Sequence, residues 1–394
     1  LPLGLFFAVR YVRRARIRDA IGAAATLAAQ VYLGWYYAFY LLIAMGTVAV
    51  HAGVSRFPAA TRARAGPLAL AAAGSALAVL PVMLPYLLQR LSMPAYHRTL
   101  GETALYSADM LDYFRTNPNV RESLLLPGGP QSYWPGLVCV FLAVAGVFDI
   151  VRRHDRVATL LPILAVTAWI LSLGPILHVA AHAIRVPLPY AALYFVPGFS
   201  SMRAPARIAV LVALCASVLS GIGGRRLYDR LGRGTAAWTA FAMLTAAAIA
   251  LAWYRPIPLL ALPRSETMPR IYAFVAAQPD RFPLLEVPVP RDEASETRRD
   301  ALRQLMILYH GKPRLDGVSG FASPRYDAFR REIQSFPDDA ALASASALGA
   351  RLILVHYGDL ALARRRALEG QVTAARRLRL VARAGDDALY RLEP

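Results

Sequence analysis

Four residues that could bind a metal ion or an acceptor substrate gather in one polar stretch of the sequence. They are His97, Glu102, Asp109 and Asp112. Residues 106–114 have helical spacing, which would place Asp109 and Asp112 on one face because they are three positions apart. Two neighbouring carboxylates can bind a divalent cation or act as a general base, and such a cation is the only cofactor that the sequence suggests. A solvated amphipathic helix lying on a membrane surface would show the same pattern, and the sequence favours this second interpretation.

Two arginines in the segment 197–207 are candidates for binding a phosphate group. The segment reads Pro-Gly-Phe-Ser-Ser-Met-Arg-Ala-Pro-Ala-Arg and contains Arg203 and Arg207. The hydropathy pattern predicts that both lie at the outer side of a membrane, where positive charges are less common. A lipid-linked phosphate would supply a counter-charge, since a guanidinium can bind phosphate oxygens through two parallel hydrogen bonds. Contact with anionic lipid headgroups explains Arg203 equally well and Arg207 slightly better.

Basic clusters alternate with apolar runs over residues 1–254. Apolar residues make up 57% of the sequence, too many for an ordinary soluble protein of 394 residues. Short basic loops between apolar stretches of about 20 residues are typical of proteins that cross a membrane several times and keep those loops in the cytoplasm. The pattern predicts a polytopic α-helical membrane domain with about seven full spans after a partial first helix. The basic clusters are Arg10–Arg18, Arg56–Arg64, Arg152–Arg156 and Arg225–Arg233.

The expected spans follow from the positions of the apolar runs. Residues 20–50 are expected to form a hairpin of two short helices that turns near Gly34, Trp35, Tyr36 and Tyr37. Residues 91–134 and 178–207 are then expected as segments outside the cytoplasm. Single crossings are predicted over Gly66–Leu88, Gly136–Val151, Val157–Ile176, Ile208–Ile222 and Ala236–Trp253.

The formal net charge of +19 raises the question of nucleic-acid binding. The basic residues of the first 254 positions stand mainly in short loops between apolar runs, and no nucleic-acid-binding motif accompanies them. In such loops, basic residues set the orientation of the chain and contact anionic headgroups. We therefore expect membrane lipids as partners and no nucleic acid.

Residues 255–394 are predicted to form a small extracytoplasmic α/β domain. Strands are expected at 283–289 and 351–356, with a closing hairpin of 376–382 and 388–392 around Gly385-Asp386. Glu286 lies inside the first of these apolar strands, where a buried carboxylate needs a partner. Helices are expected at 270–278, 298–310, 324–335, 338–348 and 359–368.

Several of these features together resemble bacterial multi-spanning glycosyltransferase-like proteins. They are the helices with short loops, the 197–207 stretch, and the outer-domain segments His310-Gly-Lys-Pro, Asp316-Gly-Val-Ser-Gly-Phe and Phe336-Pro. The resemblance covers nearly the whole chain. The family belongs to a superfamily that uses polyprenyl-phosphate-linked sugars. The resemblance implies transfer of a sugar from such a donor to an envelope glycan or lipid acceptor at the outer face of the bacterial inner (cytoplasmic) membrane, with arginine stabilising the departing phosphate.

The same resemblance implies a catalytic carboxylate in an external loop near the amino terminus. The sequence starts at Leu1 with an apolar stretch, 1–9, that is too short to span a bilayer. We therefore expect an amino-terminally truncated fragment whose catalytic residue lies upstream, and we assign the catalytic role to no residue present. The alternative is a non-catalytic membrane protein that binds or presents envelope polysaccharide or lipid.

Overall fold

The structure is a computed structural model of the chain. It describes residues 1–55, 65–92, 98–120, 131–196, 198–232, 234–253, 256, 259, 262, 268–279, 281–291, 298–317 and 323–393. The chain divides into two compact units, Leu1–Pro258 and Leu259–Pro394, called here the helical unit and the α/β unit.

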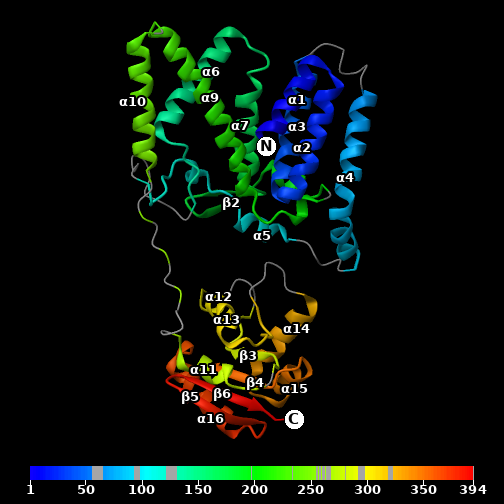
Figure 1. Cartoon of the computed structure of the whole chain (residues 1–394), viewed down its shortest axis with the longest axis vertical. Helices are drawn as coiled ribbons and strands as arrows, with labels where there is room; N and C mark the ends of the chain where they lie inside the picture. Colours follow the sequence, from blue (N-terminus) through cyan, green and yellow to red (C-terminus); the bar gives the residue numbers. More distant parts are fainter. Residues whose placement is uncertain are drawn as a thin grey trace. The chain divides into compact units, whose positions relative to one another are not determined.

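The helical unit consists mainly of α-helices (Figure 1). Its first part confirms the predicted hairpin, because α2 ends and α3 begins at Gly34. The segment between α7 and α9 contains a small β-hairpin, which the sequence did not predict. The elements are α1 (Pro2–Arg14), α2 (Ile17–Leu33), α3 (Trp35–Val54), α4 (Ala65–Ser92), α5 (Leu100–Leu105), the 3₁₀ helix η2 (Met110–Tyr113), α6 (Leu137–Arg153), α7 (Leu160–Ser172), β1 (Ile176–Val179), β2 (His182–Pro187), α8 (Pro189–Leu193), η3 (Phe199–Ser201), η4 (Pro205–Ile208), α9 (Ala209–Arg230) and α10 (Thr235–Ala252).

Among the described residues, four helices are long and apolar enough to cross a membrane. They cover Trp35–Val54, Ala69–Gln89, Pro205–Arg230 and Thr235–Ala252. This number is lower than the predicted seven or so full spans. The helices at the other three predicted spans are shorter: α2 and α6 have 17 residues and α7 has 13, at or below the lower limit of about 17 residues for a full span. The predicted span 157–176 is too long at both ends. Asp155 accepts hydrogen bonds from the backbone N–H groups of Val157 and Ala158, which form a turn before α7, and β1 begins at Ile176.

Helices α6 and α9 lie side by side (Figure 1) and cross at two glycines. A Cβ atom placed on Gly146 would lie 2.2 Å from the carbonyl oxygen of Leu219, and one on Gly223 would lie 1.9 Å from that of Leu142. Small residues at a helix crossing allow such a close approach of two backbones. The other side of α9 packs on α7, so α9 and the segment before it are held between two neighbours.

The α/β unit contains a four-stranded sheet in the order β3-β4-β6-β5. Strands β3 (Leu284–Val287) and β4 (Leu352–His356) are parallel, with Leu284 opposite Leu352. Strand β6 (Asp387–Leu392) pairs antiparallel with β4 and with β5 (Leu378–Ala384). The sequence predicted these strands to within a few residues but not their order in the sheet.

Helices cover both faces of this sheet, which explains why β3 and β4 are buried along their whole length. Alternate residues point to opposite faces: Leu285 and Ile353 pack with α14–α16, whereas Leu284 and Leu352 pack with α11 and Met306. The predicted helix 298–310 is divided at Met306, and the last one starts three residues late because a 3₁₀ turn precedes it. The helices are α11 (Arg270–Ala276), α12 (Arg298–Leu305), α13 (Ile307–His310), α14 (Pro324–Glu332), η7 (Ile333–Ser335), α15 (Asp339–Ala347), η8 (Tyr357–Asp359) and α16 (Leu362–Ala374).

Candidate functional site

The first turns of α3 and α9, together with residues 132–135, line a pocket of about 610 Å³ in the helical unit. Because Gly34 separates α2 from α3, three consecutive aromatic residues stand in the first turn of α3. Tyr36 and Tyr40 lie one turn apart on the same side of that helix. We call this cavity the aromatic pocket after the side chains that line it: Trp35, Tyr36, Tyr37, Tyr40, Tyr133 and Trp134.

Arg207 is the one charged residue among the described residues that line the aromatic pocket. Its side chain is exposed, and its guanidinium carbon lies 5.1 Å from the centre of the Tyr36 ring, which is the distance of a cation–π contact. No carboxylate within the described ranges forms an ion pair with it. Arg207 stands in η4, directly before α9, where the N–H groups of a helix start add positive potential. The pocket therefore favours an anionic group.

Tyr40 adds a buried polar group to the same pocket. The residue is 1% exposed, and its hydroxyl oxygen has no hydrogen-bond partner in the described part of the chain. By contrast, the Tyr133 hydroxyl donates to the side chain of Gln131. Buried polar atoms without partners are uncommon in native proteins. A ligand oxygen in the pocket could provide the partner that Tyr40 lacks.

Arg203 has a different environment, although it lies only four positions before Arg207. Its Nε atom is 2.9 Å from Oε1 of Glu102, and its guanidinium donates to the Tyr106 hydroxyl at 2.8 Å. The same Glu102 oxygen accepts a hydrogen bond from Arg98 at 2.7 Å. The counter-charge that the sequence analysis expected from a phosphate is thus provided, for Arg203, by Glu102.

This cluster also touches the aromatic pocket. The backbone N–H of Arg203 donates to the Tyr36 hydroxyl at 3.2 Å. Tyr36 in turn lies against Arg207, so the Arg203 segment fixes the ring on which Arg207 rests. Among the predicted site residues, Arg207 lines the pocket. Arg203 and Glu102 do not line it, but the backbone N–H of Arg203 donates to Tyr36, and Glu102 forms an ion pair with Arg203.

Asp109 and Asp112 have partners within the helical unit. Instead of the predicted helix over 106–114, the chain forms a turn and then η2, because Asp109 caps η2 and Asp112 accepts a hydrogen bond from the Asp109 backbone N–H. Asp109 also accepts hydrogen bonds from the N–H groups of Ala180 and Ala181 at 3.1 and 2.7 Å, in the β1–β2 turn. Asp112 forms an ion pair with Arg115.

These contacts affect the two carboxyls in opposite directions. Burial raises the pKa of Asp109, but the hydrogen bonds from the backbone N–H groups of Ala181, Leu111 and Ala180 outweigh burial and lower it overall. For Asp112, burial is the larger influence and raises the pKa. Both carboxylates therefore hold the segment 98–120 and its neighbours together. The described residues contain no group of three or more histidines, cysteines, aspartates or glutamates that could hold a metal ion. His97 lies outside the described residues.

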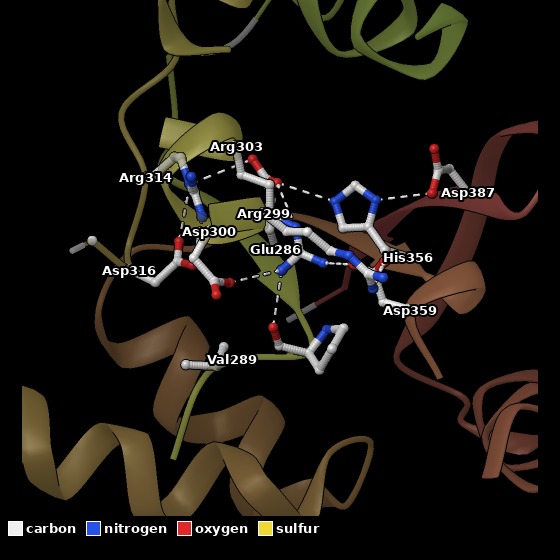
Figure 2. Close-up of polar contacts among 12 residues, drawn as sticks. Glu286, Val289, Arg299, Asp300, Arg303, Arg314, Asp316, His356, Asp359 and Asp387 are labelled. Atoms are coloured by element: carbon white, nitrogen blue, oxygen red, sulfur yellow. Dashed lines mark hydrogen bonds and ion pairs between the residues drawn. The ribbon is translucent and has the colours of Figure 1, made fainter. Parts of the chain in front are cut away.

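The α/β unit contains a buried ionic cluster around Glu286 (Figure 2). Glu286 is fully buried in β3 and has the partners that the sequence analysis required. Its Oε2 atom accepts hydrogen bonds from Tyr272 at 3.0 Å and His356 at 3.1 Å, and its Oε1 atom lies 3.4 Å from Nε of Arg314. The second ring nitrogen of His356 bonds Asp387 at 2.8 Å. This cluster links β3, β4 and β6.

The titration of this cluster follows from the contacts. Burial would raise the pKa of Glu286, but the hydrogen bond from His356 and the nearby charge of Arg314 lower it overall. Burial would lower the pKa of His356, but its hydrogen bonds to Asp387 and Glu286 raise it overall. A charged His356 between two carboxylates is the consistent state near neutral pH.

The sequence analysis found Arg207 but missed the aromatic wall around it. It placed Trp35, Tyr36 and Tyr37 at the turn of a helical hairpin, and it gave no role to Tyr40, Tyr133 or Trp134. The six residues from Trp35 to Tyr40 include two aromatic pairs at i and i+4, Trp35–Phe39 and Tyr36–Tyr40, and such pairs indicate an aromatic side of a helix. Residues 133–134 could not be assigned to the pocket from the sequence, because they line it together with residues that are far from them in the sequence.

No known family model matches this chain, and the curated proteins include none with significant similarity to it.

Proposed function

We propose that the helical unit is the lipid-carrier half of a membrane glycosyltransferase-like protein. In this proposal the aromatic pocket binds the phosphate and the sugar of a polyprenyl-phosphate-linked donor, and the sugar passes to a cell-envelope glycan or lipid at the outer face of the bacterial inner membrane. The observation that carries the proposal is Arg207, an exposed arginine without a carboxylate partner among the described residues, placed in a wall of aromatic rings.

The residues of the pocket match the two parts of such a ligand. A guanidinium binds phosphate oxygens by two parallel hydrogen bonds. Aromatic side chains bury apolar surface and offer polar edges, so they pack well against the carbon face of a sugar ring. The unpartnered Tyr40 hydroxyl would add a hydrogen bond to a ligand oxygen.

An apolar groove beside the pocket suits the lipid part of the donor. This groove has a volume of about 430 Å³ and is lined by residues of α2, α3 and α4 and by Gly198, with almost no polar atoms. Trp35 lines both the groove and the aromatic pocket. A single ligand could thus place its charged head beside Arg207 and its isoprenoid chain along α2–α4. A soluble sugar phosphate would leave the groove unused.

The roles of the two arginines then differ. During transfer, the bond between the anomeric carbon and the phosphate oxygen breaks, and the acceptor hydroxyl oxygen bonds to that carbon while a general base takes its proton. Arg207 would stabilise the negative charge of the departing phosphate. Arg203 would act as a positioning residue, because its side chain is already paired with Glu102 and Tyr106 and its backbone N–H donates to Tyr36.

The first experiment measures binding of polyprenyl phosphate to the whole chain purified in detergent. We expect Arg207→Gln to weaken binding about tenfold, as the loss of a charge-assisted contact does. Arg185→Gln is the matched control, since Arg185 is an exposed arginine of β2 outside the pocket. Polyprenol, the same lipid without the phosphate, should bind both variants equally. Equal binding of polyprenyl phosphate to the two variants would refute the proposal.

A non-catalytic protein that binds or presents envelope polysaccharide or lipid is the second candidate. It is favoured by one observation: Glu102, Asp109 and Asp112 are each occupied by contacts within the helical unit. Incubation with a polyprenyl-phosphate-linked radiolabelled hexose and an envelope extract distinguishes the two. Release of free polyprenyl phosphate supports transfer, whereas binding of the intact donor without release supports the second candidate.

A further inference from the structure

A second pocket, of about 520 Å³, lies in the α/β unit at the carboxyl ends of the parallel strands β3 and β4. Its lining comes from residues 288–291 after β3, from Asp359 after β4, and from α12 and α16. The carboxyl ends of adjacent parallel strands are a common place for ligands in α/β proteins. We call it the arginine pocket. Its charged residues are Arg291, Arg299, Asp300, Arg303, Asp359 and Arg364.

Among the described residues that line this pocket, the positive charges exceed the negative ones. These residues include four arginines and two aspartates. Asp359 forms ion pairs with Arg299 and with Arg303, and Asp300 forms one with Arg303. Both aspartates are thereby occupied. Arg291 and Arg364 are exposed, and no carboxylate in the described part of the chain forms an ion pair with either.

The ion pairs of Asp300 and Asp359 with Arg303 are anchored by the buried cluster around Glu286. The two aspartates are therefore not available to pair with the exposed arginines of the pocket. Arg303 is 6% exposed, donates to the carbonyl oxygen of Pro288 at 3.1 Å, and lies 3.9 Å from Glu286 (Figure 2). Asp359, which is bound to Arg303, is fixed in turn. Among the described residues, the positive charge of Arg291 and Arg364 is therefore not balanced by the two aspartates of the pocket.

We infer that the arginine pocket binds a small organic molecule that carries an oxyanion, either a phosphate or a carboxylate. Guanidinium groups recognise both through paired hydrogen bonds. The volume is in the range of pockets for small organic ligands and is much larger than a single inorganic ion requires. Pro288, Val289 and Pro290 provide apolar walls against which the carbon part of the ligand can pack. This site lies in a different unit from the aromatic pocket and does not depend on the function proposed for that pocket.

The test is calorimetric titration of the whole chain in detergent, in a phosphate-free buffer, with glucose 1-phosphate, glucuronate and glucose. We expect at least one of the two anions to bind and the neutral sugar to show no binding. The double variant Arg291→Gln/Arg364→Gln should weaken anion binding by about tenfold or more. Both residues are exposed and form no ion pair with a carboxylate in the described ranges, so the variant should fold normally. Preference for glucose 1-phosphate or for glucuronate identifies which oxyanion the site takes.

Two matched variants make the result specific. Arg366→Gln removes an exposed arginine from the same helix, α16, but outside the pocket, and it should bind the anion like the unmodified chain. Arg207→Gln removes the arginine of the aromatic pocket and should also leave this binding unchanged. The inference is wrong if neither anion binds, if Arg366→Gln weakens binding as much as the double variant, or if only Arg207→Gln weakens it.

Discussion

The helical unit and the α/β unit each contain arginines that the chain's own carboxylates neutralise and arginines that they do not. In the helical unit, Glu102 forms ion pairs with both Arg203 and Arg98, and its side chain is 22% exposed. In the α/β unit, Glu286 is 0% exposed and lies among Arg303, Arg314 and His356. The two networks have similar chemistry but differ in solvent exposure. Exposure decides how much each network contributes to stability, because a buried charge that loses its partner cannot bind water in its place.

The arginines without carboxylate partners differ as well. Arg207 lies among aromatic rings beside an apolar groove, which suits an amphiphile. Arg291 and Arg364 lie in a pocket with four other charged residues, which suits a water-soluble anion. Arginines without carboxylate partners can therefore bind different ligands, because the residues around each arginine determine which uncharged part of a ligand fits.

Glu286→Gln should have the largest effect on stability. It leaves Arg314 and His356 next to a neutral amide in a fully buried site, and breaking a buried ion pair costs about 3–5 kcal/mol. Amide hydrogen exchange of peptides covering β3 and β4 should become faster by about a hundredfold or more. Glu369→Gln, at a partly exposed ion pair on α16, is the control and should cost less than about 1 kcal/mol. Equal exchange rates in the two variants would contradict the claim that the buried ion pair contributes more to stability than the partly exposed one.

Asp109→Asn should have an intermediate effect. Asp109 accepts three backbone hydrogen bonds, and an amide offers only one acceptor oxygen, so we expect a loss of about 1–3 kcal/mol. The measurement is thermal unfolding of the chain in detergent. Asp155→Asn is the control, because Asp155 also accepts backbone N–H groups but is exposed, and water can replace the lost contact. A larger loss for Asp155→Asn would show that burial does not control these contacts.

Glu102→Gln should cost about 0.5–1 kcal/mol in stability, because the ion pairs that it weakens are partly exposed. Binding of polyprenyl phosphate should stay within about twofold of that of the unmodified chain, since Glu102 supports the pocket without lining it. Comparison with Arg207→Gln in the same binding assay separates the two roles. If Glu102→Gln lost binding as strongly as Arg207→Gln, Glu102 would contribute to the donor site, whereas the sequence analysis predicted a role for it in binding an acceptor or a metal ion.

The smallest effect is expected from pH. Folding raises the pKa of His356, so the folded state holds this proton more tightly than the unfolded state. The resulting stability is fully present below the unfolded pKa of about 6.5 and is lost as pH rises through the raised folded pKa. The free energy of unfolding of the α/β unit should therefore decrease as pH rises from about 6.5 through the raised folded pKa. Amide hydrogen exchange of β4, corrected for the intrinsic exchange rate at each pH, measures this decrease. In His356→Gln this dependence should disappear; if it remained unchanged, another group would be responsible.

The sequence predicts local features of this molecule better than its contacts. The strands around Glu286 and Leu354 are correct to within a few residues, because runs of buried aliphatic residues are their direct signal. The break at Gly34 is also correct. Spans were overestimated where an apolar run continues into a turn or a strand, as at Ile176, since hydropathy does not distinguish these from a helix.

Contacts between distant residues could not be predicted. Nothing in the spacing of Glu102 and Arg203 indicates that they form an ion pair, so the sequence analysis assigned the counter-charge of Arg203 to a phosphate. Similarly, Asp109 and Asp112 were expected on one helix face, but the capping of η2 and the distant turn at Ala180 decide their positions. Arg207 was found because its motif is local, whereas the rings around it come from separate segments.

The close approach of α6 and α9 at Gly146 and Gly223 limits which amino acids these two positions can accept. Any residue other than glycine at position 146 or 223 places a Cβ atom where a carbonyl oxygen already lies, and α7 on the other side of α9 opposes a shift of that helix. At Gly46, Gly74 and Gly221 an added Cβ meets no atom within 4 Å. In a library of random substitutions selected for folded protein, the first two positions should remain glycine and the other three should accept alanine or serine freely.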